Sequence, residues 1–256
     1  MEVLFLGTCA CDYSPLLQTT YKDVFDKDAR RSSSALINGK YLIDCGQHCL
    51  EELRIAKVDL AQITDIFVTH FHSDHYNVEC IKQIAQASER TLRVWVRSDA
   101  RVLGISNVEW KLMKKGVRYS VAQGVFVTGL LANHNESVFP QHILLEADGK
   151  KLFYALDGAW FLHETYYALK NANLDFLVLD CTCGDYLGDY RIGEHNSIPM
   201  IRLMLPSLKK WGVITEKTQV YVSHLAPSLH KSHDETVEIL QKDGVCVAYD
   251  GLRVEL

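Results

Sequence analysis

The pattern of apolar and polar residues predicts a chain of short buried strands and amphipathic helices. Apolar runs at 2–6, 34–38, 40–45 and 63–69 are typical of buried strands, and Asn38-Gly39 between two of them is a strong hairpin signal. Residues 118–156 form a β-rich stretch. Further strands are expected at 92–96, 174–181 and 219–224, and a hairpin is expected to close the chain over 245–256.

Helical patterns lie between these strands, at 47–57, 76–88, 161–171, 199–212 and 233–242, and in part of 98–115. No linker rich in Pro, Gly or Ser divides the sequence. We therefore predict one α/β domain over residues 1–256, with two sheets face to face and helices outside. Residues 12–33 form a polar stretch too long for an ordinary hairpin loop, and we expect this stretch to form one wall of a site.

Composition narrows the classes of function. The 256 residues carry a formal net charge of −5, which argues against a broad binding surface for nucleic acid or an anionic membrane. The N-terminus lacks the basic region of a signal peptide, and no apolar run approaches the ~18 residues of a membrane helix. We expect a cytoplasmic protein whose 8 cysteines, none in a C-x-x-C pair, are free thiols.

The segment THFHSDH, which ends at His75, follows a predicted strand and is rich in residues that bind metals. His70 and His72 are two apart, so they point the same way in an extended backbone, whereas the side chains of Asp74 and His75 diverge. One loop can therefore serve two neighbouring metal ions. Imidazole and carboxylate suit zinc, iron and manganese, and clustered imidazoles have no role in apolar packing.

Three later strands also end in residues of this kind. His134 follows VFVTGLLAN, Asp157 follows KLFYAL, and His224 follows QVYVS. A single His or Asp after a strand is usually a turn or cap residue. The whole ordered series, H-x-H-x-D-H and then His, Asp and His, is the pattern of the metallo-β-lactamase superfamily, which this chain resembles over its full length.

The resemblance implies a four-layer αββα sandwich and two divalent metal ions, with Zn²⁺ expected first and Mn²⁺ or Fe²⁺ as alternatives. Its ligand positions match His70, His72 and His134 for the first metal, Asp74, His75 and His224 for the second, and Asp157 as the bridge between them. Asp44 matches an aspartate that supports the metal loop from behind the ligands. The implied chemistry is attack on phosphorus by a hydroxide held between the two metals, with Asp74 in a catalytic role.

The segment GEHNSIP, residues 193–199, resembles the PhnP-type phosphodiesterases, which are relatives of tRNase Z. In that group a histidine at this place contacts the phosphate or protonates the leaving oxygen, which implies catalytic and substrate-binding roles for His195. Arg30 and Arg31 resemble another element of the group, but we expect them to be solvated. His230 and His233 are expected to be exposed near the start of a helix. The stretch 12–33 has no cysteine, so we expect no additional structural zinc.

These features predict a metal-dependent phosphodiesterase that acts on a small cyclic or linear phosphodiester. A lactonase or thioesterase of the same fold is the alternative, and a non-catalytic metal-binding or regulatory protein is the alternative from another class. A membrane partner is not expected and a nucleic-acid partner is disfavoured by the charge. Pairing into a homodimer, which is common in this fold, stays open.

Overall fold

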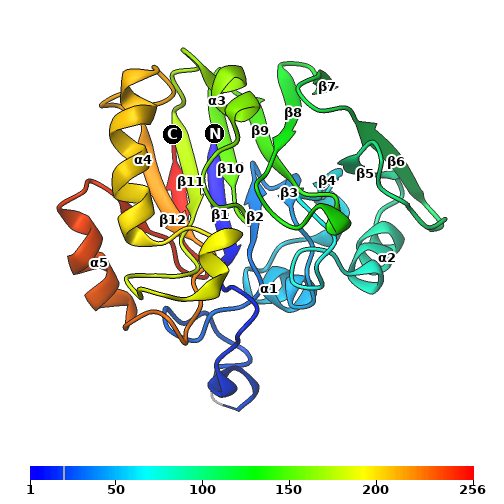
Figure 1. Ribbon diagram of the computed structural model, residues 1–256. Helices are drawn as coiled ribbons and strands as arrows, with labels where there is room; N and C mark the ends of the chain where they lie inside the picture. Colours follow the sequence, from blue (N-terminus) through cyan, green and yellow to red (C-terminus); the bar gives the residue numbers. More distant parts are fainter. Residues whose placement is uncertain (20) are drawn as a thin grey trace.

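Two β-sheets form the centre of the computed structural model, which describes residues 1–19 and 21–256 (Figure 1). The strands of the first sheet, in spatial order, are β14 (Arg253–Glu255), β1 (Glu2–Gly7), β2 (Ser34–Ile37), β3 (Tyr41–Ile43), β4 (Asp65–Phe67), β5 (Leu92–Arg97) and β6 (Val108–Met113). Those of the second are β13 (Cys246–Val247), β12 (Gln219–Ser223), β11 (Phe176–Asp180), β10 (Lys150–Ala155), β9 (Gln141–Ala147), β8 (Val125–Leu131) and β7 (Arg118–Ala122).

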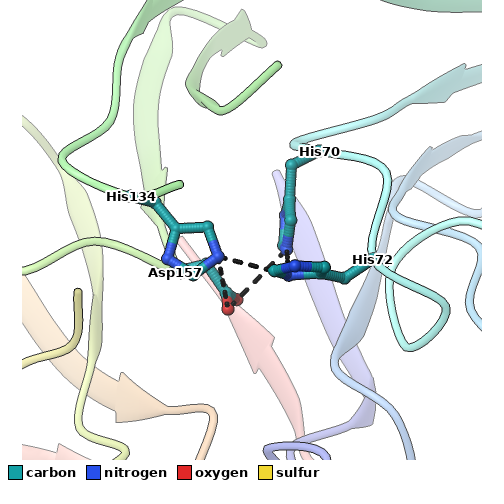
Figure 2. Close-up of side chains that lie close together, drawn as sticks. All are labelled: His70, His72, His134 and Asp157. Carbon is teal, nitrogen blue, oxygen red and sulfur yellow. Dashed lines mark hydrogen bonds and ion pairs between the residues drawn. The ribbon is translucent and has the colours of Figure 1, made fainter. Parts of the chain in front are cut away.

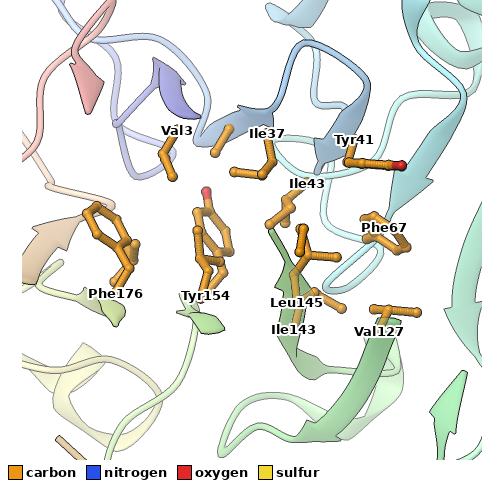
Figure 3. Close-up of a cluster of buried hydrophobic side chains, with 14 of the residues drawn as sticks. Val3, Ile37, Tyr41, Ile43, Phe67, Val127, Ile143, Leu145, Tyr154 and Phe176 are labelled. Carbon is orange, nitrogen blue, oxygen red and sulfur yellow. The ribbon is translucent and has the colours of Figure 1, made fainter. Parts of the chain in front are cut away.

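Both faces of the central strands are buried, which explains their nearly continuous apolar sequences. In β1, Val3 and Phe5 belong to the core between the sheets, whereas Leu4 and Leu6 belong to the core on the outer face. Figure 3 shows apolar side chains of the two sheets meeting in the central core. That core includes Val3, Ile37, Ile43 and Phe67 from the first sheet and Val127, Ile143, Leu145, Tyr154 and Phe176 from the second.

Helices cover the two outer faces. The first sheet is covered by α1 (Cys49–Ile55) and α2 (Val78–Ala87), which contribute Leu53 and Ile81 to the same apolar cluster as Leu4. The second sheet is covered by α3 (His163–Leu169), α4 (Ile198–Lys210) and α5 (His233–Gln241), whose apolar residues pack with those of β10 to β12. The expected αββα arrangement is confirmed.

The predicted hairpin at Asn38-Gly39 is confirmed. Strands β2 and β3 pair antiparallel on either side of it. Asn38 and Gly39 have φ angles of 52° and 65°, the left-handed geometry that Asn and Gly adopt more readily than other residues, and Ile37 pairs with Tyr41 across the turn. The Asn38 side chain also connects the turn to β1, because its Oδ1 accepts a hydrogen bond of 2.8 Å from the backbone N–H of Glu2.

Two predictions of secondary structure are wrong. The expected closing hairpin at 245–256 does not form, because β13 pairs parallel with β12 and β14 pairs antiparallel with β1 in the other sheet. The helix expected within 98–115 is also absent from this range, where β6 pairs parallel with β5 along its whole length. In both cases a long-range ladder outweighs a local pattern that is compatible with more than one structure.

The polar stretch 12–33, of which Thr20 lies outside the described residues, is held by two arginines that were expected to be solvated. The Arg31 guanidinium donates to Glu51 at 2.9 Å and to the backbone oxygens of Tyr21 and Val24. Arg30 donates to the Thr8 hydroxyl at 2.6 Å and lies 3.1 Å from Nδ1 of His233. These contacts bury both arginines, so they order the loop.

His230 and His233, expected to be exposed, are partly and fully buried. Nε2 of His230 lies 2.6 Å from the backbone oxygen of Cys181. His233 packs edge-on against Tyr249. In the described part of the chain, no helix has both the length and the apolar character needed to cross a membrane.

Candidate metal centre

The ends of four strands bring the predicted ligands to one rim of the sandwich. The loop with His70 to His75 follows β4, and His134, Asp157 and His224 follow β8, β10 and β12. The loop belongs to the first sheet and the other three residues to the second. Gly46 lets the backbone approach the loop closely, because a Cβ atom there would lie 1.9 Å from the backbone oxygen of Asp74. The site therefore lies across the seam between the sheets.

His70, His72 and His134 point their ring nitrogens toward one another (Figure 2). Nδ1 of His72 lies 2.9 Å from Nε2 of His70 and 3.2 Å from Nε2 of His134. Oδ1 of Asp157 lies 3.8 Å and 4.0 Å from these two Nε2 atoms. We call these three histidines the first cluster.

Asp74, His75 and His224 form a second cluster on the other side of Asp157. Nε2 of His75 lies 3.2 Å from Nε2 of His224 and 3.3 Å from Oδ2 of Asp74. Oδ2 of Asp157 lies 2.9 Å from Nε2 of His75 and 3.1 Å from Nε2 of His224. Asp157 therefore presents one oxygen to each cluster.

Residues that contact the ligand histidines on the side away from the clusters fix the orientation of the imidazole rings. Asp44 is fully buried, and its carboxylate accepts hydrogen bonds from the backbone N–H and hydroxyl of Thr69 and lies 2.8 Å from Nδ1 of His75. The Thr182 hydroxyl lies 2.7 Å from Nδ1 of His224. With Nδ1 engaged, the lone pair of each Nε2 is free for a cation, so the donor set fits divalent metal ions.

The electrostatics favour positive charge at this site, which a metal ion supplies when it displaces the proton of a histidine. Burial lowers the pKa of His75, but Asp157, Asp74 and Asp44 outweigh burial and hold the pKa well above its usual value. Burial raises the pKa of Asp157, but His224, His75 and His70 outweigh burial and hold the pKa well below its usual value. Asp157 is therefore ionised at neutral pH and presents anionic oxygen to a cation.

His195 lies beside the second cluster, where its ring stacks on that of His224 at a centroid distance of 5.4 Å. Its Nδ1 lies 2.8 Å from Oδ2 of Asp180 and 3.1 Å from the Thr182 hydroxyl. Burial lowers the pKa of His195, but Asp180 outweighs burial and raises the pKa. Because Asp180 and Thr182 engage Nδ1, Nε2 is the ring nitrogen left for a substrate.

A cavity of about 770 Å³ opens over both clusters. One wall is a 3₁₀ turn, η4 (Tyr190–Gly193), with Glu194 and His195 directly after it. Another wall includes Ala10, Cys11 and Asp12. Asp12 is the only residue of the stretch 12–33 among the described residues that line this cavity, so most of that stretch is not the wall that we expected.

Sequence reasoning missed several residues of this site. Asp180 had a usable signal, because it ends a buried strand just as the recognised ligands follow theirs. Thr182, Arg191 and Glu194 had none, because a hydroxyl or a charged side chain in a loop is usually solvated.

Comparison with known sequences gives partial matches. A profile of the family described as "Anti-Pycsar protein Apyc1" matches residues 25–98. Ribonuclease Z of Crocosphaera subtropica is 37% identical over 75 residues, which are 29% of this chain and 22% of that protein. Zinc phosphodiesterase ELAC protein 1 of Bos taurus is 35% identical over 80 residues, 30% of this chain and 18% of that protein. The chain thus matches only about a fifth of the length of these curated relatives.

Comparison with solved structures covers the whole chain. Zn²⁺-bound PqqB from Methylobacterium extorquens has a TM-score of 0.76 at 17% identity and covers 100% of both chains. The metallo-β-lactamase fold protein YhfI from Bacillus subtilis has a TM-score of 0.75 at 16% identity, covering 100% of this chain and 99% of its own.

A diphosphatase described as a member of the PhnP family has a TM-score of 0.75 at 19% identity, covering 100% of this chain and 98% of its own. These matches confirm the expected fold and the expected similarity to PhnP and tRNase Z proteins. The chain has the metallo-β-lactamase fold, with two His/Asp clusters suited to divalent metals at the rim of its sandwich.

Proposed function

We propose that this chain is a metal-dependent phosphodiesterase acting on a small cyclic or linear phosphodiester. The observation that carries the proposal is the position of Asp157, whose two carboxylate oxygens face two separate clusters of ligand-type residues. A carboxylate placed in this way is suited to bridge two ions. Two such ions would supply a nucleophile from water and would stabilise charge on the phosphoryl oxygens.

The chain's own residues would perform three further tasks. Asp74 lines the cavity, and although burial raises its pKa, His75 and His224 outweigh burial and hold the pKa below the usual range, so its ionised carboxylate can accept a hydrogen bond from the attacking water and orient it. His195 directs Nε2 to the substrate because Asp180 engages Nδ1, so this ring is placed to donate a proton to the leaving oxygen.

Arg191 is suited to bind an oxygen of the phosphate or of the attached group. The guanidinium donates to the Asp189 carboxylate through Nε at 2.8 Å and through Nη2 at 3.0 Å, so that its direction is fixed. An anionic substrate also suits a centre with two divalent ions and a neighbouring guanidinium better than a neutral ester does. This supports a phosphodiester over a lactone or thioester, which remains the second candidate substrate class.

The proposal is tested by measuring hydrolysis of bis(4-nitrophenyl) phosphate, 4-nitrophenyl acetate, a γ-lactone and a thioester with added Zn²⁺ or Mn²⁺. We expect the highest kcat/KM for the phosphodiester. Asp157→Ala should abolish this activity and reduce the bound metal, whereas the exposed control Asp234→Ala should retain both. A clear preference for the lactone or thioester would favour the second candidate, and metal binding without hydrolysis of any substrate would contradict an enzymatic role.

A further inference from the structure

Four of the ligand histidines are buried, and each turns its Nε2 toward the clusters and its Nδ1 away from them. In all but one of these histidines, Nδ1 lies at hydrogen-bond distance from another side chain. Nδ1 of His70 lies 3.0 Å from the Thr69 hydroxyl, and those of His75 and His224 meet Asp44 and Thr182 as described above. Nδ1 of His134 is also buried but has no hydrogen-bond partner among the described residues. An unpaired buried ring nitrogen is costly, and a histidine that binds a metal normally donates this N–H to a carboxylate or another acceptor.

Glu194 is the carboxylate that lies beside this nitrogen. Its Oε2 is 3.5 Å from Nδ1 of His134, and within the described part of the chain its side chain has no other hydrogen bond or ion pair. The side chain of Glu194 is 52% exposed, so it can turn toward His134 without leaving a buried partner. A movement of well under 1 Å would give an ordinary N–H···O hydrogen bond.

Glu194 belongs to the wall of the cavity. It directly follows the turn η4, which presents Tyr190 and Arg191 to the cavity, and it directly precedes His195. We call residues 190–195 the wall segment. A bond between Glu194 and His134 would therefore join this segment to the first cluster, which lies next to it.

We propose that Glu194 is a positioning residue, which accepts a hydrogen bond from Nδ1 of His134 when the first cluster holds a divalent metal ion, and that this bond couples metal binding to the order of the wall segment. The coupling is reciprocal, so an ordered wall segment also strengthens metal binding. This inference rests on the metal centre of the proposed function. It does not depend on the identity of the substrate.

The test measures Zn²⁺ affinity by competition with a chromogenic chelator, and amide hydrogen exchange of the wall segment with and without Zn²⁺. Glu194→Ala should weaken binding by about 10- to 100-fold, as for other residues that support metal ligands. Glu194→Gln, which keeps an acceptor oxygen without the charge, should weaken binding less. Zn²⁺ should slow exchange in the wall segment of the unmodified protein and have little effect there in Glu194→Ala.

The exposed residue Glu238 on α5 offers a matched control, because Glu238→Gln removes the same charge far along the chain from this site. Unchanged Zn²⁺ affinity in Glu194→Ala, or unchanged protection of its wall segment, would overturn the proposal. If the unmodified protein binds Zn²⁺ with this coupling but hydrolyses no phosphodiester, the proposed function fails and the role of Glu194 stands. If the unmodified protein binds no divalent metal, both fail.

Discussion

Three residues of the metal centre have a strained backbone. Asp44, Asp157 and His224 have φ angles of 63°, 52° and 57°, in the left-handed region that residues other than glycine seldom adopt. Each such conformation costs about 1–3 kcal/mol, and it persists only where the surrounding structure enforces it. In this protein the strained conformations direct the Asp44 carboxylate toward His75 and place Asp157 and His224 at the rim. The fold therefore gives up some stability to hold the geometry of the site.

His195 gives the first prediction at this scale. If its ring donates a proton to the leaving oxygen, His195→Ala should lower kcat by about 10²- to 10⁴-fold for phosphodiesters with poor alcohol leaving groups. The loss should be much smaller for 4-nitrophenyl esters, because nitrophenolate leaves without protonation. Steady-state kinetics on both substrate types would measure the difference.

A matched control for this variant is the exposed His163 on α3, since His163→Ala removes an imidazole away from the cavity. It should behave as the unmodified protein on both substrates. An equal loss on both substrate types in His195→Ala would instead indicate that His195 only binds the phosphate.

His142 predicts how stability depends on pH. The ring is fully buried against Phe153 and Phe161, and burial lowers its pKa to about 4. The unfolded chain, with the ordinary pKa near 6.5, therefore binds more protons than the folded chain between these two values. Stability should fall as the pH falls through this window, and His142→Phe should remove this part of the loss.

The size of the effect follows from linkage. Lowering the pH from 7 to 5 should cost the unmodified protein about 2 kcal/mol more than His142→Phe, measured as free energies of unfolding in urea. The ring of Phe has nearly the same shape, so the apolar contacts should be retained. Parallel pH profiles of the two proteins would show that His142 does not contribute.

At the scale of elements, the sequence predicts the interior of the fold better than its edges. Strands β1 to β5 and β8 to β12 lie inside the two sheets, and their apolar runs identified them. Strands β6, β13 and β14 are edge strands and are short or half-exposed, so their local sequence fits several structures. Residues 249–252 contain the sequence YDG, which is typical of a hairpin turn, but they connect strands of two different sheets. Pairing of β13 and β14 with distant strands, and not the local sequence, decides this connection.

The N-terminal cap of helix α5 predicts how one side chain contributes to the stability of a whole element. Ser232 and Glu235 form a reciprocal capping box, in which each side chain accepts from the other's backbone N–H. Ser232→Ala removes one half of this arrangement and should lower the free energy of unfolding by about 1 kcal/mol. Urea denaturation would measure the change, with the neighbouring exposed Lys231→Ala as a control that should have little effect.

At the scale of the whole molecule, the candidate metal centre joins the two sheets. The loop after β4 supplies His70, His72, Asp74 and His75, and the second sheet supplies the other three residues. The order of ligand types along the chain was enough to predict that these side chains converge. It was not enough to predict Thr182 or Glu194, because their contacts depend on side-chain geometry that no spacing in the sequence encodes. Asp180 differs from these two, because its place at the end of a buried strand is a signal that the sequence does contain.

Metal ions bound at this seam should therefore stabilise the whole fold. At a free metal concentration 100 times the Kd, each ion that binds only the folded chain adds about 2.7 kcal/mol, which for a chain of this size corresponds to about 5–10 °C in Tm per ion. Calorimetry should show this rise when Zn²⁺ or Mn²⁺ is added to the EDTA-treated protein. Because Asp157 faces both clusters, Asp157→Ala should lose most of the rise, whereas Asp234→Ala should keep it. A Tm that is the same with EDTA and with metal would mean that these clusters hold no ion in the folded state, since any ion bound only to that state must raise its stability.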